Sequence, residues 1–296
     1  MANIARNARP DWVDDDLFPF VSRFIDIDGH TVHYVDEGTG PTLLFLHGNP
    51  TWSFFWHDVI RALRGDFRCV ALDYPGFGLS TPKTGYRYLP AEHADVVTAF
   101  VDALGLDAVT LVGQDWGGLI GLAVVQGRLT AFDRLVLANT WAWPVNGDFH
   151  FEWYSRIIGG PPVRFLTRRL NFLVNVLIPM GHRLRKPTPA EMSHYRRALD
   201  TPERRQASAI LPGQITASRA FFAEVASGLS ALEQLQTLII WGSAQIGFRP
   251  KERERLEAAF PEHETVIVEG AGDFVVSDAP EEFVAAIRDW VAAQPN

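Results

Sequence analysis

The stretch LVGQDWGGLIGL, residues 111–122, decides how this chain folds. An apolar run ends at Gly113, a carboxylate stands at Asp115, and Gly117 and Gly118 precede an apolar pattern of helical spacing. Small residues around Asp115 permit a sharp turn from a strand into a helix, which lifts one side chain above a sheet. A lone Asp could simply cap a helix, but the strand–G-x-D-x-G-G–helix context favours this turn, a nucleophile elbow. Its helix N-terminus would stabilise negative charge on the carboxylate.

Other short apolar runs surround the elbow in the order expected of a layered sheet. A hairpin pattern, RFIDIDGHTVHYVDEG (23–38), is followed by the runs TLLFLH (42–47), FRCVALD (67–73), AVTLVG (108–113), RLVLAN (134–139), TLIIWG (237–242) and TVIVEG (265–270). Segments of helical periodicity lie between them, at residues 55–63, 90–104 and 117–126, near 249–260, and from about 279 onward. Alternation of buried strands with helices predicts a mostly parallel, eight-stranded α/β sheet.

The alternation stops after Asn139 and resumes near residue 236. Residues 141–228 are helical in pattern and rich in arginine and aromatic residues. We expect a helical cap at residues 141–228, inserted into a core formed by residues 1–140 and 229–296. Basic residues gather between Arg164 and Arg205, either as a solvated helical face or as an interaction surface.

Composition excludes several classes of protein. The net charge of −8 over 296 residues argues against nonspecific nucleic-acid binding. No run is long and apolar enough to span a membrane, and residues 1–12 lack the apolar stretch of a signal peptide. The single Cys69 permits no disulfide within the chain, which fits a reducing compartment. We expect a cytoplasmic protein, monomeric or homodimeric, with neither a membrane nor nucleic acid as partner.

A second motif lies in LLFLHGNPTW, residues 43–52. The loop after this strand would present a backbone amide opposite the elbow and complete an oxyanion hole. We interpret His47 as a structural residue of the loop, and Asn49 as a side chain whose amide could enter the pocket. Trp141 and Trp143, which begin the cap, and Phe248 are our candidates for lining that pocket. No metal-ligand cluster, phosphate loop or dinucleotide motif is present in the sequence, so we expect no cofactor and no metal.

Five motifs together resemble the haloalkane dehalogenase family of α/β-hydrolases: HGNPTW (47–52), DYPGFGLS (73–80), GQDWGG (113–118), NTWAWP (139–144) and IIWGSAQIGFRP (239–250). The resemblance implies that Asp115 displaces halide from a small apolar substrate and becomes an alkyl ester. It also implies that the side chains of Asn49 and Trp116 hold the departing halide. Epoxide hydrolases are similar at fewer points; they use cap tyrosines, and Tyr154 and Tyr195 lie in the predicted cap.

The chain departs from that family at two positions. Where the family has its histidine base, GAGDF (270–274) has Asp273, and where it has an acid, WGSAQ (241–245) has Gln245. A third position, near Asn139, carries the acid in some relatives and is also an amide here. We expect Asp115, Asp273 and Gln245 to form the catalytic group, with Gln245 donating a hydrogen bond to Asp273.

Three interpretations of this altered site stay open. Asp273 serves as the base, for dehalogenation or for another reaction of a carboxylate pair such as epoxide opening. Alternatively, the enzyme is trapped as an alkyl ester, because ester hydrolysis is impaired. In the third, the pocket only binds a small apolar ligand.

Overall fold

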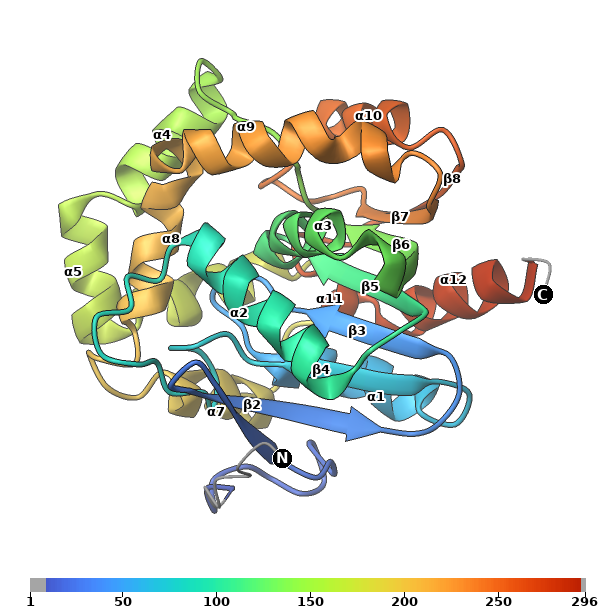
Figure 1. Ribbon diagram of the computed structural model, residues 1–296. Helices are drawn as coiled ribbons and strands as arrows, with labels where there is room; N and C mark the ends of the chain where they lie inside the picture. The colour runs from blue at the N-terminus through green and yellow to red at the C-terminus, as the bar shows by residue number, and fades with distance from the viewer. Residues whose placement is uncertain (1–8, 294–296) are drawn as a thin grey trace.

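The computed structural model describes residues 9–293, which form one twisted sheet with helices on both faces and a helical cap at one end (Figure 1). The strand order is β1-β2-β4-β3-β5-β6-β7-β8. The strands are β1 (Arg23–Ile27), β2 (His30–Glu37), β3 (Thr42–Leu46), β4 (Arg68–Leu72), β5 (Val109–Gln114), β6 (Phe132–Ala138), β7 (Gln236–Gly242) and β8 (His263–Val268). Only β1–β2 and β2–β4 pair antiparallel. The predicted eight-stranded, mostly parallel sheet is confirmed.

Side chains of the central strands alternate between two apolar cores. In β3, Leu44 and Leu46 belong to one core, and Leu43 and Phe45 to the other. The first core packs against α2 (Pro90–Leu104), α3 (Trp116–Gly127) and α10 (Pro250–Ala259). The second packs against α1 (His57–Leu63) and α12 (Pro280–Ala293). Burial on both faces explains why these strands read as continuous apolar runs rather than as alternating ones.

The strand-to-helix turn between β5 and α3 depends on glycines at two positions. A Cβ at Gly117 would lie 1.9 Å from the Leu46 carbonyl oxygen, and one at Gly113 would lie 2.7 Å from that of Gly117. Between them, Asp115 has φ +53° and ψ −125°, which non-glycine residues seldom adopt. Absence of both side chains therefore lets α3 begin directly against the end of β3 and hold Asp115 in its strained conformation.

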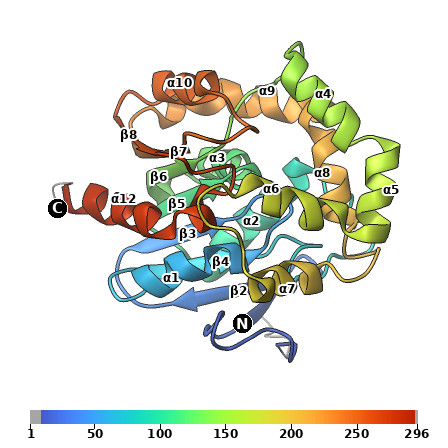
Figure 2. The same ribbon diagram turned by 180° about the vertical axis from the view of Figure 1, so that it is seen from behind.

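The cap follows β6 and precedes β7, and it covers the carboxyl ends of the parallel strands (Figures 1 and 2). Its helices are α4 (Phe149–Ile158), α5 (Pro161–Leu170), a π-helical turn (Leu173–Leu177), α6 (Ile178–Gly181), α7 (Pro189–Ala198), α8 (Gln206–Ala217) and α9 (Arg219–Gly228). Shorter 3-10 turns are η1 (Ser53–Trp56), η2 (Leu129–Ala131) and η4 (Leu229–Leu232). No helix within residues 9–293 has both the length and the apolarity needed to cross a membrane. The N-terminal residues in which no signal peptide was expected lie largely outside the described part.

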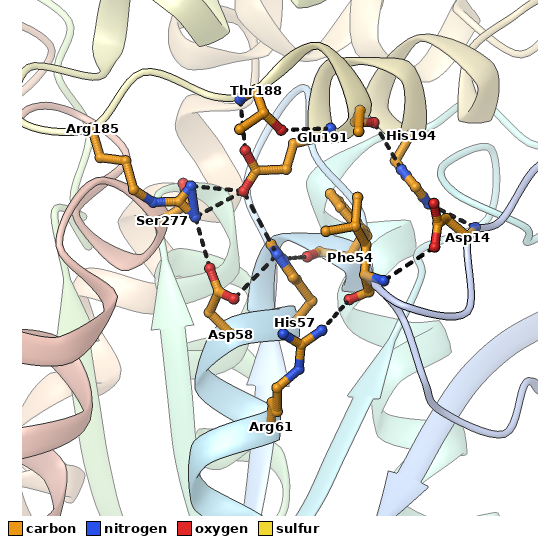
Figure 3. Close-up of polar contacts among 12 residues, drawn as sticks. Asp14, Phe54, His57, Asp58, Arg61, Arg185, Thr188, Glu191, His194 and Ser277 are labelled. Atoms are coloured by element: carbon orange, nitrogen blue, oxygen red, sulfur yellow. Dashed lines mark hydrogen bonds and ion pairs between the residues drawn. The ribbon is translucent and has the colours of Figure 1, made fainter.

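A charged cluster connects the cap to the core (Figure 3). The Arg185 guanidinium donates to Asp58 of α1 and to Glu191 of α7, each at 2.7 Å. The imidazole of His57 lies beside both carboxylates, with Nε2 3.4 Å from Asp58 and 3.8 Å from Glu191. His57, Asp58 and Glu191 are a metal-ligating combination of residue types. Because Arg185 already compensates both carboxylates, we assign the cluster to joining cap and core.

Asp278, at the end of α11 (Val275–Asp278), fixes a second junction between cap and core. Its Oδ1 accepts the amides of Leu184 and Arg185, and its Oδ2 accepts those of Arg183 and Gly272, at 2.7–2.8 Å. Its place in the sequence just before α12 (Pro280–Ala293) is that of an N-cap, but the carboxylate turns toward residues 183–185, where it satisfies four donors that the loops themselves leave without acceptors.

We expect Asp278→Asn to lower the free energy of unfolding by about 3 kcal/mol, because an amide nitrogen would face two backbone donors and leave them unsatisfied. Urea unfolding followed by circular dichroism measures the change. Glu281→Gln, on the exposed first turn of α12, is the matched control. A loss for Asp278→Asn no larger than that of the control would contradict this role.

Candidate active site

Asp115 stands at the centre of the site with its carboxylate held by two backbone amides. Its Oδ2 accepts the amide of Asn49 at 3.0 Å, and the amide of Trp116 also donates to the carboxylate. A Cβ at Gly48 would fall 2.6 Å from the same oxygen, so the loop can approach only because residue 48 is glycine. The two amides lie on either side of the elbow, where the sequence analysis expects an oxyanion hole, and they bind the carboxylate itself.

The carboxylate opens into a cavity of about 140 Å³ between the sheet and the cap. Most of its wall is apolar, as suits a small apolar molecule. Its lining comprises Asn49, Gln114, Asp115, Trp116, Trp141, Phe151, Tyr154, Leu177, Met180, Gly181, Pro212, Ile215, Ile246, Gly247, Phe248, Asp273 and Phe274.

Two of the three aromatic residues expected in the pocket lie there, Trp141 and Phe248, with ring centroids 5.4 Å apart. The expectation for Trp143 is wrong. Its ring packs under the guanidinium of Arg255 on α10, 4.2 Å from the centroid, and lines an outer depression instead. The backbone turns between Trp141 and Trp143 as it leaves β6, so the two rings point to different surfaces.

Asp273 faces the same cavity from the loop between β8 and α11. Its Oδ1 accepts the amides of Ile246 and Gly247, at 3.0 and 2.6 Å. Its own amide donates to the Gly181 carbonyl of α6 at 2.8 Å. The carboxylate is therefore positioned by backbone donors of the loop after β7, and the cap helps to hold its backbone.

Gln245 does not donate to Asp273, contrary to the expectation from sequence. Its Nε2 donates to Oδ1 of Asn139 at 3.0 Å, and that oxygen also accepts the amide of Gly242. The Asn139 amide group in turn donates to the carbonyl oxygens of Gly272 and Asp273. Gln245 thus acts on the loop of Asp273 through Asn139, and the backbone amides of the next two residues, Ile246 and Gly247, bind the carboxylate in its place.

Gln114 is a site residue that the sequence reasoning missed. Its Nε2 donates to the Asp273 carbonyl at 3.0 Å, while its Oε1 is buried without a hydrogen-bond partner among residues 9–293. A signal was available, since Gln114 is a polar residue at the end of an otherwise apolar strand and directly precedes the elbow. The side chain connects the two carboxylate-bearing loops.

Both carboxylates have elevated pKa values. Burial raises the pKa of Asp115 to about 7, against the opposing effect of its two amide donors, and the negative charge of Asp273 raises it further. Burial also raises the pKa of Asp273, although the amides of Gly247 and Ile246 oppose the change. Each carboxylate therefore holds a proton more readily than a free aspartate, and the two titrate as a coupled pair.

The side chains expected to bind halide, Asn49 and Trp116, border the cavity together. Asn49 Nδ2 donates to the Ser208 carbonyl of α8 at 3.3 Å, which leaves its second N–H for another acceptor. Asn49 Oδ1 is buried with no partner in the described structure. The α8 contact orients this amide from the cap side.

The two cap tyrosines occupy different places. Tyr154 lines the cavity, where burial first and then the charges of Asp115 and Asp273 raise its pKa. Tyr195 packs edge-on against Phe54, with centroids 5.3 Å apart, and is not among the lining residues. A ring-opening mechanism with both tyrosines therefore lacks one of its donors in the cavity.

Histidine is absent from the lining residues of the cavity. The cap histidines are held elsewhere: His150 contacts the Gly247 carbonyl, His182 contacts Ser277, and His194 contacts the Asp14 amide. His47 is fully buried, and burial lowers its pKa to about 4, as suits the structural role expected of it. The titratable groups of the cavity are two carboxylates and a tyrosine.

Relatives of this chain include dehalogenases of high similarity. Proteins named haloalkane dehalogenase 2 in Mycobacterium bovis and Mycobacterium tuberculosis are 46% identical over 276 residues, which cover 93% of this chain and 96% of theirs. A cis-3-alkyl-4-alkyloxetan-2-one decarboxylase of Shewanella oneidensis is 26% identical over 294 residues, covering 94% of this chain and 90% of its own.

Solved structures of dehalogenases have the same fold. The haloalkane dehalogenase DbeA of Bradyrhizobium elkani superposes with a TM-score of 0.84 at 24% identity, covering 92% of this chain and 98% of its own. A putative ancestral haloalkane dehalogenase gives 0.82 at 26% identity, with 91% and 98% covered. A family model described as alpha/beta hydrolase fold matches residues 41–280. The chain therefore belongs to the alpha/beta-hydrolase fold family, as a haloalkane dehalogenase-like member.

Proposed function

We propose that this enzyme transfers the alkyl group of a small apolar haloalkane to Asp115 and hydrolyses the resulting ester slowly. The observation that carries the proposal is the Asp115 carboxylate, set at a strained elbow, bound by two amides and open to an apolar cavity. The similarity to haloalkane dehalogenases supports the same chemistry.

In the first step an ionised oxygen of Asp115 attacks the carbon that bears the halogen. The carbon–oxygen bond forms as the carbon–halogen bond breaks, and the electron pair of that bond leaves with the halide. The indole N–H of Trp116 and the second N–H of Asn49 stabilise the departing charge. The step needs position and charge but no proton transfer, so it requires no histidine.

In the second step a base must remove a proton from the water that attacks the ester. We assign this base to Asp273. Once Asp115 is esterified its negative charge is lost, and Asp273 then ionises more readily. Burial raises the pKa of Asp273, but two amides already bind its Oδ1 and leave Oδ2 to accept the proton from water, which makes the second step slow.

With a bromo- or iodoalkane in excess, we expect about one equivalent of halide in a burst and an alkyl adduct on Asp115. The later release should be slower than the burst by roughly a thousandfold or more, because removing a member of a catalytic triad costs about ten-thousandfold or more in rate. Intact-protein mass spectrometry with a parallel halide assay follows both steps.

The variants separate the two carboxylates. Asp115→Asn should give neither burst nor adduct, whereas Asp273→Asn should keep the burst and lengthen the lifetime of the adduct. Steady halide release without an adduct would contradict slow hydrolysis. If neither halide nor an adduct appears with any of the haloalkanes, the cavity has only a binding role.

The rate of the burst should increase with pH, because only the ionised Asp115 attacks. With a pKa raised to about 7, the rate should rise about tenfold per pH unit below pH 6 and level off above pH 8. Asp273→Asn removes a negative charge beside Asp115, so it should move the midpoint to lower pH. Rapid-quench mass spectrometry from pH 5 to 9 measures the profile, and a flat profile would contradict the assignment.

A second candidate substrate is an oxetan-2-one, on which the relative from Shewanella acts by name. The absence of histidine from the lining residues of the cavity favours it. Asp115 would displace the ring oxygen from its sp³ carbon, giving an alkyl ester and a free carboxylate. Cleavage of the bond to that carboxylate would release CO₂, form the alkene and expel Asp115 as carboxylate. Neither step consumes water or requires a base.

For this substrate we expect repeated turnover where a haloalkane gives a single burst. A cis-3,4-dialkyloxetan-2-one should yield equal amounts of alkene and CO₂, detected by gas chromatography. Asp115→Asn should abolish the reaction, and Asp273→Asn should largely retain it. Formation of the hydroxy acid instead of the alkene would exclude this candidate.

A further inference from the structure

Charge is distributed very unevenly along the cap. Residues 153–190 contain no aspartate or glutamate, although the whole chain has a net charge of −8. The same segment holds seven basic residues: Arg156, Arg164, Arg168, Arg169, Arg183, Arg185 and Lys186. Arg185 is used in the cluster with Asp58 and Glu191. The remaining positive charge makes one part of an acidic protein attractive to anions.

An apolar stripe runs along the outer face of α4. Phe149, Trp153 and Ile157 occur at intervals of four residues and are 80%, 55% and 44% exposed. The opposite side of the helix, with Phe151 and Ser155, is buried. Such spacing on a helix places the three side chains on one face, and no described residue covers it.

The neighbouring helix α5 combines basic and apolar exposed residues. Arg164, Arg168 and Arg169 surround Phe165, which is 61% exposed, and none of the three arginines forms an ion pair within residues 9–293. The guanidinium of Arg169 lies 5.9 Å from the centre of the Phe165 ring. Glu203 is the one carboxylate that lines this basic depression.

Both helices lie at the outer edge of the cap, on the left in Figure 1 and on the right in Figure 2. The chain continues from α5 through the π-helical turn to α6, where Met180 is half exposed and also lines the cavity. Ile246, on the far wall of the cavity, is likewise half exposed. Exposed apolar side chains thus border the cavity as well as the outer edge of the cap.

We propose that α4 and α5 dock the enzyme on the surface of an anionic lipid bilayer. Phe149, Trp153 and Phe165 enter the boundary between headgroups and acyl chains, and the arginines of α5 bind lipid phosphates. Aromatic side chains beside arginines are the combination that interfacial helices use. The expectation of no membrane partner rested on the lack of a spanning segment, which does not bear on peripheral docking.

Charge decides between a bilayer and a second copy of this chain as the occupant. A symmetric dimer through this face would bring the arginines of two α5 helices toward each other, because each copy presents the same patch. An anionic bilayer instead compensates them, at about fivefold in affinity for each arginine near the surface. Docking there would also place the cavity close to a phase in which apolar substrates dissolve.

The test is cosedimentation of the whole protein with phosphatidylcholine vesicles, with and without phosphatidylglycerol. We expect binding to the anionic vesicles only, weakening as salt rises from about 0.05 M to about 0.5 M. The variant Arg168→Gln with Arg169→Gln should bind roughly 25-fold more weakly. Trp153→Ser should lose roughly tenfold or more, because an inserted indole no longer leaves water.

Matched controls come from exposed residues outside α4 and α5. Arg23→Gln with Arg219→Gln removes the same charge, and Val21→Ser removes an exposed apolar side chain of the core. These variants should bind like the parent protein. Thermal unfolding and the Asp115 burst should be unchanged in every variant, which separates docking from folding and from the chemistry of the cavity.

Four outcomes would overturn the proposal. One is equal sedimentation with neutral and anionic vesicles, and another is equal loss in the control variants. Complete competition by millimolar inorganic phosphate would identify a site for soluble anions instead. Concentration-dependent dimers in the absence of lipid, broken by Trp153→Ser, would assign the face to self-association.

Discussion

The contact between Gly117 and the Leu46 carbonyl is the constraint on which the rest of the site depends. Strands β3 and β5 are parallel neighbours, with Leu46 opposite Gly113, so the two strands end side by side at the same edge of the sheet. Without a side chain at residue 117, α3 can begin against the end of β3. The loop after β3 then lies over the elbow, and the amide of Asn49 meets the carboxylate of Asp115. A larger residue there would separate the Asp115 carboxylate from one of its two amide donors.

The loop that carries Asp273 is held through its backbone. Asp278 holds the amide of Gly272, and the Asn139 amide group holds the carbonyl oxygens of residues 272 and 273. Together they fix the backbone of the loop, so that the side chain of residue 273 faces the cavity. This explains how a carboxylate is accommodated in the site, since the support acts on the main chain and does not depend on the side chain of that residue.

Sequence reasoning succeeded where a pattern is local and failed where a side chain's direction depends on distant packing. Three features follow from spacing along the chain: the elbow, the order in which strands and helices succeed one another, and the places of Trp141 and Phe248. Trp143 differs from Trp141 by only two residues, but its direction depends on Arg255 of α10. Gln245 and Asp278 find their partners in Asn139 and residues 183–185, far away in sequence. Such partners become visible only when β6, β7 and the cap are assembled.

The aspartate at position 273 sets the electrostatics of the cavity. A neutral side chain opposite Asp115 would leave that carboxylate ionised at little cost, whereas Asp273 can place a second negative charge in the same buried space. When both carboxylates are ionised, amides stabilise each of them, from Asn49 and Trp116 on Asp115 and from Ile246 and Gly247 on Asp273.

Loss of the charge on either carboxylate removes the repulsion between them, so the presence of Asp273 favours any reaction that esterifies Asp115. The same repulsion opposes hydrolysis of the ester, because hydrolysis restores the negative charge of Asp115. An ester that is removed by expelling CO₂ would gain the driving force of that release, whereas the ester formed from a haloalkane must be hydrolysed against this repulsion, in keeping with the slow second step proposed for it.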